Sequence, residues 1–151
     1  MAEDRESLLE HYRATRRELL AALDGLDEGQ ATEPSLDGWS VKDHLAHIAF
    51  WDDIRTAEVA RISAGFESAW PHMDEEQTEV LNSFIHWARQ ALSLEQVRWE
   101  LAVSRERLLA AIMSASERGL DDAHYREAAL RSTHEAAHAA WIRRWRAERG
   151  L

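Results

Sequence analysis

Residues 39–51 of the chain read Trp39-Ser40-Val41-Lys42-Asp43-His44-Leu45-Ala46-His47-Ile48-Ala49-Phe50-Trp51. Ser40 is a favourable N-cap residue, because its hydroxyl can accept a hydrogen bond from a free backbone N–H group of the first helical turn. Asp43 falls in that turn, where a negative charge interacts favourably with the helix dipole. Apolar side chains recur beyond it at helical spacing, and Gly65 is a suitable stop. The stretch therefore predicts a long helix from Ser40 to about Ala64.

Helical spacing of apolar residues continues through the rest of the chain, and no alternating strand pattern is present. Helices are expected at residues 4–24, 40–64, 74–92, 93–115 and 122–148, with loops at 27–38, 65–73 and 117–121. Ser93 and Gln96 have the spacing of a capping box, which marks the start of the fourth helix. The residues expected to form the buried face of the third helix are Val80, Leu81, Phe84, Ile85, Ala88 and Leu92. These patterns predict an all-α fold, a four-helix bundle with room for one short extra helix, in a single domain over residues 1–151.

The composition limits the classes of function open to this chain. Its 151 residues are 45% hydrophobic and 30% charged, a balance typical of globular proteins in water. The formal net charge of −10 disfavours nucleic acid as a partner, because a phosphate backbone repels an acidic surface. No cysteine is present, so disulfides, thiolate ligands and a cysteine nucleophile are excluded. No apolar run is long enough to span a membrane and no secretory signal is visible, so we expect a cytoplasmic protein with no membrane partner.

Three histidines form a candidate metal site. His134 and His138 are four residues apart, so on a helix they lie about 40° apart around the axis and about 6 Å apart along it. They share a stripe with Trp141 and Trp145, which places them on the apolar face of the last helix. His47 belongs to a second helix and can meet them if both helices face one core. Three converging imidazoles can hold a divalent metal and leave one coordination position open, as a catalytic site requires.

Spacing leaves several interpretations of the histidines open. Without thiolate ligands, such a site suits Zn, Ni, Fe or Mn, with Zn or Ni as the first expectation. His44 lies one turn before His47; it is the reserve ligand, or it orients a carboxylate or bound water from outside the ligand set. The plain alternative is a group of hydrogen-bonded bundle histidines with no metal. The histidines expected at the surface or at the edge of the core are His11, His72, His86 and His124.

Residues 134–138 also match the HExxH string of zinc proteases, in which two histidines bind Zn and the glutamate acts as general base. A protease is disfavoured, because the chain shows no β-sheet on which a peptide substrate could align. Glu135 also lies about 100° from His134 on a helix, beside Arg131 on what the pattern indicates is the polar face. We therefore expect Glu135 to be a solvated side chain.

Two tryptophans are placed to line a cavity beside the histidines. Trp51 follows His47 by one turn, and Trp141 follows His138 at helical spacing. Apolar walls around a few polar groups are typical of a ligand pocket. Asp52, one position beyond Trp51, is expected to be solvated, with a place next to the metal ligands as the alternative.

The stretch at residues 39–51 resembles the second-helix motif of the DinB/YfiT-like superfamily of metal-dependent enzymes, which have a four-helix bundle core. In those proteins a tryptophan just before the helix is followed about eight residues later by a ligand histidine; the equivalents here are Trp39 and His47. The family's other two ligands lie four residues apart on the last long helix, which corresponds to His134 and His138. The resemblance extends over nearly the whole chain. It implies that these three histidines bind the metal and that the HExxH match is coincidental.

The superfamily includes thiol-dependent S-transferases and isomerases, which use mycothiol, bacillithiol or glutathione, and it includes hydrolases. The resemblance therefore implies a divalent-metal-binding enzyme that acts on a small-molecule substrate, often as a homodimer, with a low-molecular-weight thiol as cosubstrate in a transferase. A bound metal would lower the pKa of a coordinated water or thiol. No residue besides the three ligands is assigned a catalytic role. The alternative is a non-catalytic dimeric binding or stress-response protein whose histidine cluster or metal is structural.

Overall fold

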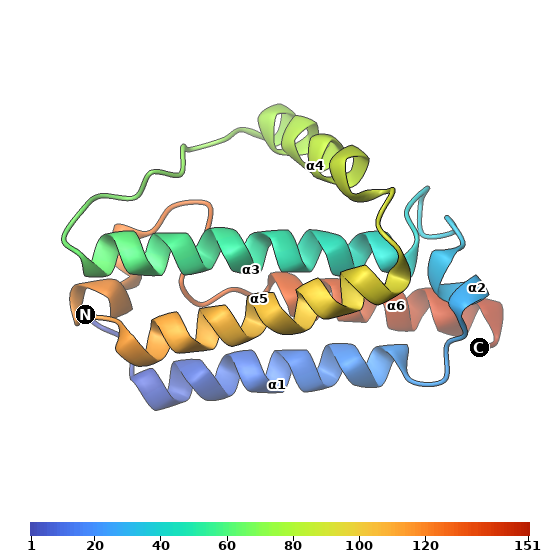
Figure 1. Ribbon diagram of the computed structural model, residues 1–151, viewed down its shortest axis with the longest axis horizontal. Helices are drawn as coiled ribbons and strands as arrows, with labels where there is room; N and C mark the ends of the chain where they lie inside the picture. The colour runs from blue at the N-terminus through green and yellow to red at the C-terminus, as the bar shows by residue number, and fades with distance from the viewer.

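Four long helices pack side by side into a bundle (Figure 1). They are α1 (Arg5–Leu23), α3 (Val41–Ser63), α5 (Leu94–Ser114) and α6 (His134–Arg149). α1 and α6 run in one direction along the bundle, and α3 and α5 run in the opposite direction. The computed structural model describes residues 1–151 and contains no β-strand, so the predicted all-α four-helix bundle is confirmed. None of its helices combines the length and the apolar character needed to cross a membrane.

Two further helices lie outside the four-helix core. The short extra helix is α2 (Glu28–Thr32), which falls within a region predicted to be a loop. The other is α4 (Glu75–Arg89), which lies over α3 (Figure 1) and is joined to α5 by the ion pair of Arg89 with Glu100. Because α4 is covered on one side only, the buried face predicted for it is wrong in extent: Ile85 is buried, but Val80 and Phe84 are 66% and 59% exposed.

Local capping interactions start three helices where the sequence predicts them. Ser40 Oγ accepts a hydrogen bond from the Asp43 backbone N–H at 3.1 Å, and the Asp43 carboxylate accepts one from the Ser40 N–H at 2.8 Å. Ser93 and Gln96 form the same reciprocal pair at α5, and Asp74 caps α4. One such cap contributes on the order of 1 kcal/mol to stability. The starts of α3, α4 and α5 are therefore fixed by residues three positions apart.

The last helix begins later than predicted. The sequence pattern indicates a start near residue 122, but α6 begins at His134, after an irregular segment at residues 125–133. The Tyr12 hydroxyl donates to a carbonyl of this segment, and Arg55 Nε donates to another at 2.8 Å. These bonds from α1 and α3 hold the segment in a non-helical path. The two 3-10 turns that precede it are η1 (Arg118–Leu120) and η2 (Asp122–His124).

The buried core consists of two apolar clusters with a charged layer between them. One cluster includes Leu19 of α1 and Leu101 of α5. The other includes Tyr12 of α1 and Leu108 of α5. On both helices an arginine falls between the two apolar positions, half-buried Arg16 on α1 and buried Arg105 on α5, so the bundle is apolar toward both ends and ionic in the middle.

The charged layer contains one side chain from each long helix: Arg16 of α1, Asp52 of α3, Arg105 of α5 and Glu135 of α6. Arg105 Nε lies 2.9 Å from Asp52 Oδ2, and Arg105 Nη2 donates to Glu135. Arg16 Nη2 lies 3.1 Å from the same Asp52 oxygen, and Arg16 Nε lies 2.6 Å from Glu135 Oε1. Burial alone would lower the pKa of the Arg105 guanidinium, but Asp52 and Glu135 raise it above its usual value, so Arg105 stays ionised.

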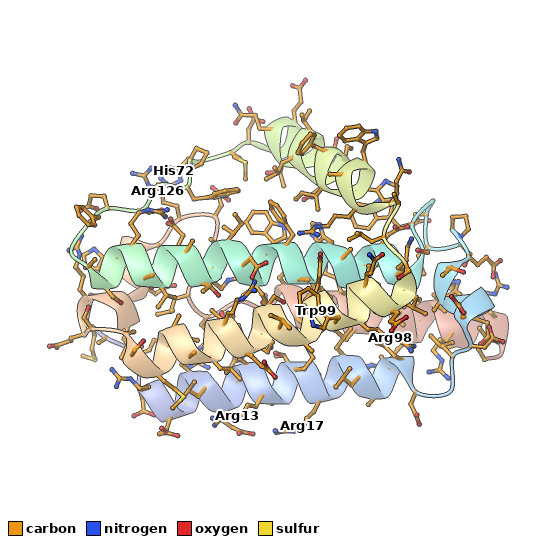
Figure 2. The ribbon with its side chains drawn as sticks, in the orientation of Figure 1. Arg13, Arg17, His72, Arg98, Trp99 and Arg126 are labelled. Carbon is orange, nitrogen blue, oxygen red and sulfur yellow. The ribbon has the colours of Figure 1, made fainter.

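The expectation that Glu135 and Asp52 are solvated is wrong. The two residues are 5% and 1% exposed. Their charges are tolerated because Glu135 is paired with two guanidinium groups and Asp52 with three, those of Arg16, Arg105 and Arg55. On α1, Arg13 and Arg17 project away from the bundle (Figure 2), whereas Arg16 turns inward to the network.

Replacing Glu135 with glutamine should destabilise the protein, because Arg16 and Arg105 would then share a buried layer with one carboxylate fewer. We expect the Glu135→Gln variant to lose about 3 kcal/mol in free energy of unfolding, as measured by urea denaturation. Glu106→Gln, at an exposed position of the neighbouring α5, is the matched control and should change stability by less than about 0.5 kcal/mol. Equal stability of the two variants would contradict a structural role for the network.

Candidate metal centre

Three of the predicted histidines meet between α3 and α6. His47 lies in the second turn of α3, His134 is the first residue of α6, and His138 follows one turn later. Nε2 of His134 lies 2.9 Å from Nε2 of His47 and 2.9 Å from Nε2 of His138. The candidate ligand atoms of the three residues all lie within 4.8 Å of one another. His47 and His138 are buried and His134 is half-buried.

This geometry fits a divalent cation. Tetrahedral zinc with imidazole ligands at 2.0–2.1 Å places the ligand nitrogens about 3.3 Å apart, and two of the nitrogen pairs are 2.9 Å apart here. Without a cation the cluster is poorly satisfied, because each nitrogen of a neutral imidazole carries either one proton or one lone pair. The single Nε2 of His134 faces two other Nε2 atoms and cannot make two good hydrogen bonds with them. A cation would accept all three lone pairs at once.

The surroundings keep the three imidazoles neutral. Burial lowers the pKa of His47 to about 3, with further contributions from His134 and His44. Burial also lowers the pKa of His134 to about 4, and the nearby Arg55 guanidinium acts in the same direction. The pKa of His138 is lowered as well, mainly by burial and then by His134. At neutral pH each ring therefore offers a lone pair, which is the form that binds a metal.

Tryptophans surround the histidines. Trp39 packs edge-to-face against both His44 and His47, with ring centroids 5.3 Å apart in each pair. Trp51 lies 6.2 Å from His134 between centroids, and Trp141 lies 4.9 Å from His138. Both Trp51 and Trp141 line the cavity described below, as the sequence predicts.

A two-residue turn that was predicted only as loop places Trp39 against the histidines. Leu36 and Trp39 exchange two backbone hydrogen bonds across Asp37 and Gly38. Both central residues have positive φ, 54° for Asp37 and 92° for Gly38, as a type I′ turn requires. Asp-Gly is among the strongest sequence signals for this turn, so the sequence contains the information that fixes Trp39 just before the N-cap of α3.

The three histidines open onto a cavity of about 1160 Å³. Its apolar walls include Leu36, Met73 and four tryptophans, and its polar lining includes Asn82 and Arg55. Arg55 is 4% exposed, and its charge is offset by Asp52. The cavity therefore gives a small molecule access to the point where the imidazoles converge.

The remaining five histidines are not part of the converging set. His44, the reserve ligand, lies outside the converging set and instead contacts the far side of the His138 ring, with the two Nδ1 atoms 2.6 Å apart. His11 Nε2 lies 2.7 Å from the Ser132 carbonyl oxygen. The histidines found at the surface or at the edge of the core, as predicted, are His11, His72, His86 and His124.

Comparison with known proteins identifies the family of the chain. The family model that describes the DinB superfamily matches residues 11–144 of this chain, a range that includes all three converging histidines. No protein with curated annotation matches the chain.

Two solved structures have a similar fold. One is an uncharacterised protein from Escherichia coli UTI89, with a TM-score of 0.79 and 16% sequence identity over 97% of this chain and 95% of that chain. The other is a protein from Streptococcus pneumoniae, with a TM-score of 0.74 and 17% identity over 97% of this chain and 92% of that chain. At these identities the likeness supports the fold alone. The family match extends over most of the sequence, and the chain therefore belongs to the DinB superfamily.

Proposed function

We propose that the protein is a metal-dependent enzyme that binds one divalent ion through His47, His134 and His138 and acts on a small molecule. The observation that carries the proposal is that three neutral imidazoles converge at the wall of a large cavity. Structural zinc sites are closed by four protein ligands, whereas catalytic sites have three and leave a position open to the solvent or substrate. The three-histidine set at a cavity wall is of the second kind.

The cavity suits an organic substrate with an apolar part. Trp39, Trp51 and Trp141 supply flat apolar walls beside the histidines. Most of the other lining residues are polar or charged, among them Arg55 and Asn82, and these can orient a ligand through hydrogen bonds. We expect the tryptophans to hold the apolar part of the substrate while its reacting group approaches the three imidazoles.

Within this class we favour thiol-dependent S-transfer over hydrolysis. When bound, a divalent metal lowers the pKa of a coordinated thiol or water and so supplies a nucleophile at neutral pH. A zinc hydrolase of the HExxH type also needs its glutamate as general base. Here Glu135 is bound to Arg16 and Arg105 in the charged layer, so its carboxylate is not free for that role. A thiolate nucleophile has no such requirement.

The donor set limits the choice of metal. Three imidazoles suit Zn or Ni as first candidates, with Fe or Mn as alternatives. The homodimer expected from the family resemblance stays a prediction, as does the low-molecular-weight thiol cosubstrate.

Protein purified without a His-tag should contain about one equivalent of a divalent metal, as measured by elemental analysis. His138→Ala should lose most of it, because one of three donor nitrogens is gone. His86→Ala removes a histidine outside the cluster and should retain the metal. Less than about 0.2 equivalents in the wild type, unchanged in His138→Ala, would contradict the proposed site and favour a non-catalytic protein with structural histidines.

The proposed reaction is tested by adding low-molecular-weight thiols and electrophiles to the metal-loaded protein. We expect thiol consumption that falls at least about 100-fold in His47→Ala, because the metal that activates the thiol is lost. Equal rates in the wild type and in His47→Ala would argue against metal-dependent transfer. Metal-dependent ester hydrolysis that needs no thiol would instead identify a hydrolase.

The metal-free protein should become less stable as the pH falls below about 6.5, the ordinary pKa of histidine. His47 and His134 have lowered pKa values in the folded state, so the unfolded chain binds more protons than the folded one between pH 6.5 and about 4. Each buried imidazole then contributes a loss on the order of 1 kcal/mol per pH unit. Urea denaturation at several pH values measures the slope, which should be smaller in His47→Phe. An identical slope in that variant would show that the site does not cause the pH dependence.

A further inference from the structure

The His44 side chain contacts Nδ1 of His138, on the side of the ring that points away from the histidine cluster. Their Nδ1 atoms are 2.6 Å apart, which is a short hydrogen bond between two buried rings. The ring of His138 therefore uses both nitrogens: Nε2 faces His134 in the cluster, and Nδ1 faces His44. His44 lies on α3 one turn before His47, so this helix supplies both a cluster residue and a partner for another one.

The chemistry of imidazole decides which ring donates in this hydrogen bond. If His138 binds a metal through Nε2, that nitrogen has no proton, and the neutral ring carries its proton on Nδ1. His138 Nδ1–H must then donate to His44 Nδ1, and His44 must carry its own proton on Nε2, which is buried and has no hydrogen-bond partner in the protein. The reverse arrangement would place a proton on His138 Nε2, where it would block the metal.

We propose that His44 is a positioning residue that accepts the Nδ1–H of His138 and holds its ring with Nε2 toward the metal. The inference rests on the proposed metal site, and it assigns a function to the one nearby imidazole that the ligand set leaves out. A ligand histidine whose outer N–H has a fixed acceptor is held in the metal-binding tautomer and is a stronger donor.

The contacts around the cluster make this role specific to His44. Nδ1 of His47 is buried and has no hydrogen-bond partner, so His47 lacks the support that His138 has. The His44 ring is itself held in place, because Trp39 and Trp141 both pack against it edge-to-face. Loss of His44 should therefore loosen one particular ligand and leave the other two in place.

Three variants separate the hydrogen bond from simple packing. His44→Phe keeps an aromatic ring but removes the acceptor, whereas His44→Asn places an amide oxygen close to the position of the histidine Nδ1. His86→Phe is the control, because His86 stacks on Trp39 but does not contact the cluster. We expect His44→Phe to weaken zinc binding about 10- to 100-fold in competition with a chelator, and His44→Asn and His86→Phe to stay within about threefold of the wild type.

The visible absorption of the cobalt-substituted protein gives a second readout that a packing defect alone would not move. It should change in His44→Phe, because one imidazole is reoriented, and should return toward the wild-type spectrum in His44→Asn. Equal zinc affinity and equal cobalt spectra in wild type and His44→Phe would overturn the role of His44 while leaving the metal site intact. Absence of zinc binding by the wild type would overturn the metal site itself.

Nitrogen NMR of the wild-type protein tests the inference without any variant. In the zinc-loaded form, His138 should carry its proton on Nδ1 and His44 on Nε2. A proton on His44 Nδ1 in that form would contradict the proposal, because two donors would then face each other.

Discussion

The pairing of buried charges in the middle of the bundle is the constraint on which the site depends. Arg16, Asp52, Arg105 and Glu135 come from four different helices, and each is bound to two of the others. A buried charge without a partner is far more costly than a suboptimal apolar contact. Sliding any one helix by a turn would leave a buried charge without its partner, so the network fixes the register of all four helices. His134 is the neighbour of Glu135, and His47 precedes Asp52 by five positions, so the same register brings the imidazoles together.

The irregular segment at residues 125–133 is a second structural feature that shapes the site. Arg55 reaches across from α3 to bind one of its carbonyls, and it also lies beside His134, where its charge helps to keep that ring neutral. The segment contributes Glu127 and Ser132 to the cavity lining. If α6 began near residue 122, these residues would instead form part of a continuous helix. The late start of α6 therefore makes His134 a first-turn residue at the edge of a cavity.

The features that could be predicted from the sequence are those that depend on near neighbours in the chain. The starts of α3 and α5 follow from capping pairs three residues apart, and the histidine pair follows from spacing on one face of α6. The burial of the charged residues could not be predicted, because charged residues are ordinarily assigned to the surface. A signal exists, because Leu101, Arg105, Leu108 and Ile112 follow one helical stripe with the arginine in it. Its meaning depends on Asp52 and Glu135, which are distant in sequence. The start of α6 depends in the same way on side chains of α1 and α3.

The HExxH string shows how packing changes the chemistry that a motif can support. His134 and His138 face the cavity, while Glu135 points from the same helix into the core, where Arg16 and Arg105 bind its carboxylate. In a zinc protease the glutamate must reach the metal-bound water, which requires that it be free to take up and release a proton. In this chain both oxygens of the Glu135 carboxylate accept hydrogen bonds from guanidinium groups, one from Arg16 and one from Arg105. Glu135 thus helps to fix the register of the bundle. Any reaction at the three histidines has to proceed without Glu135 as a base.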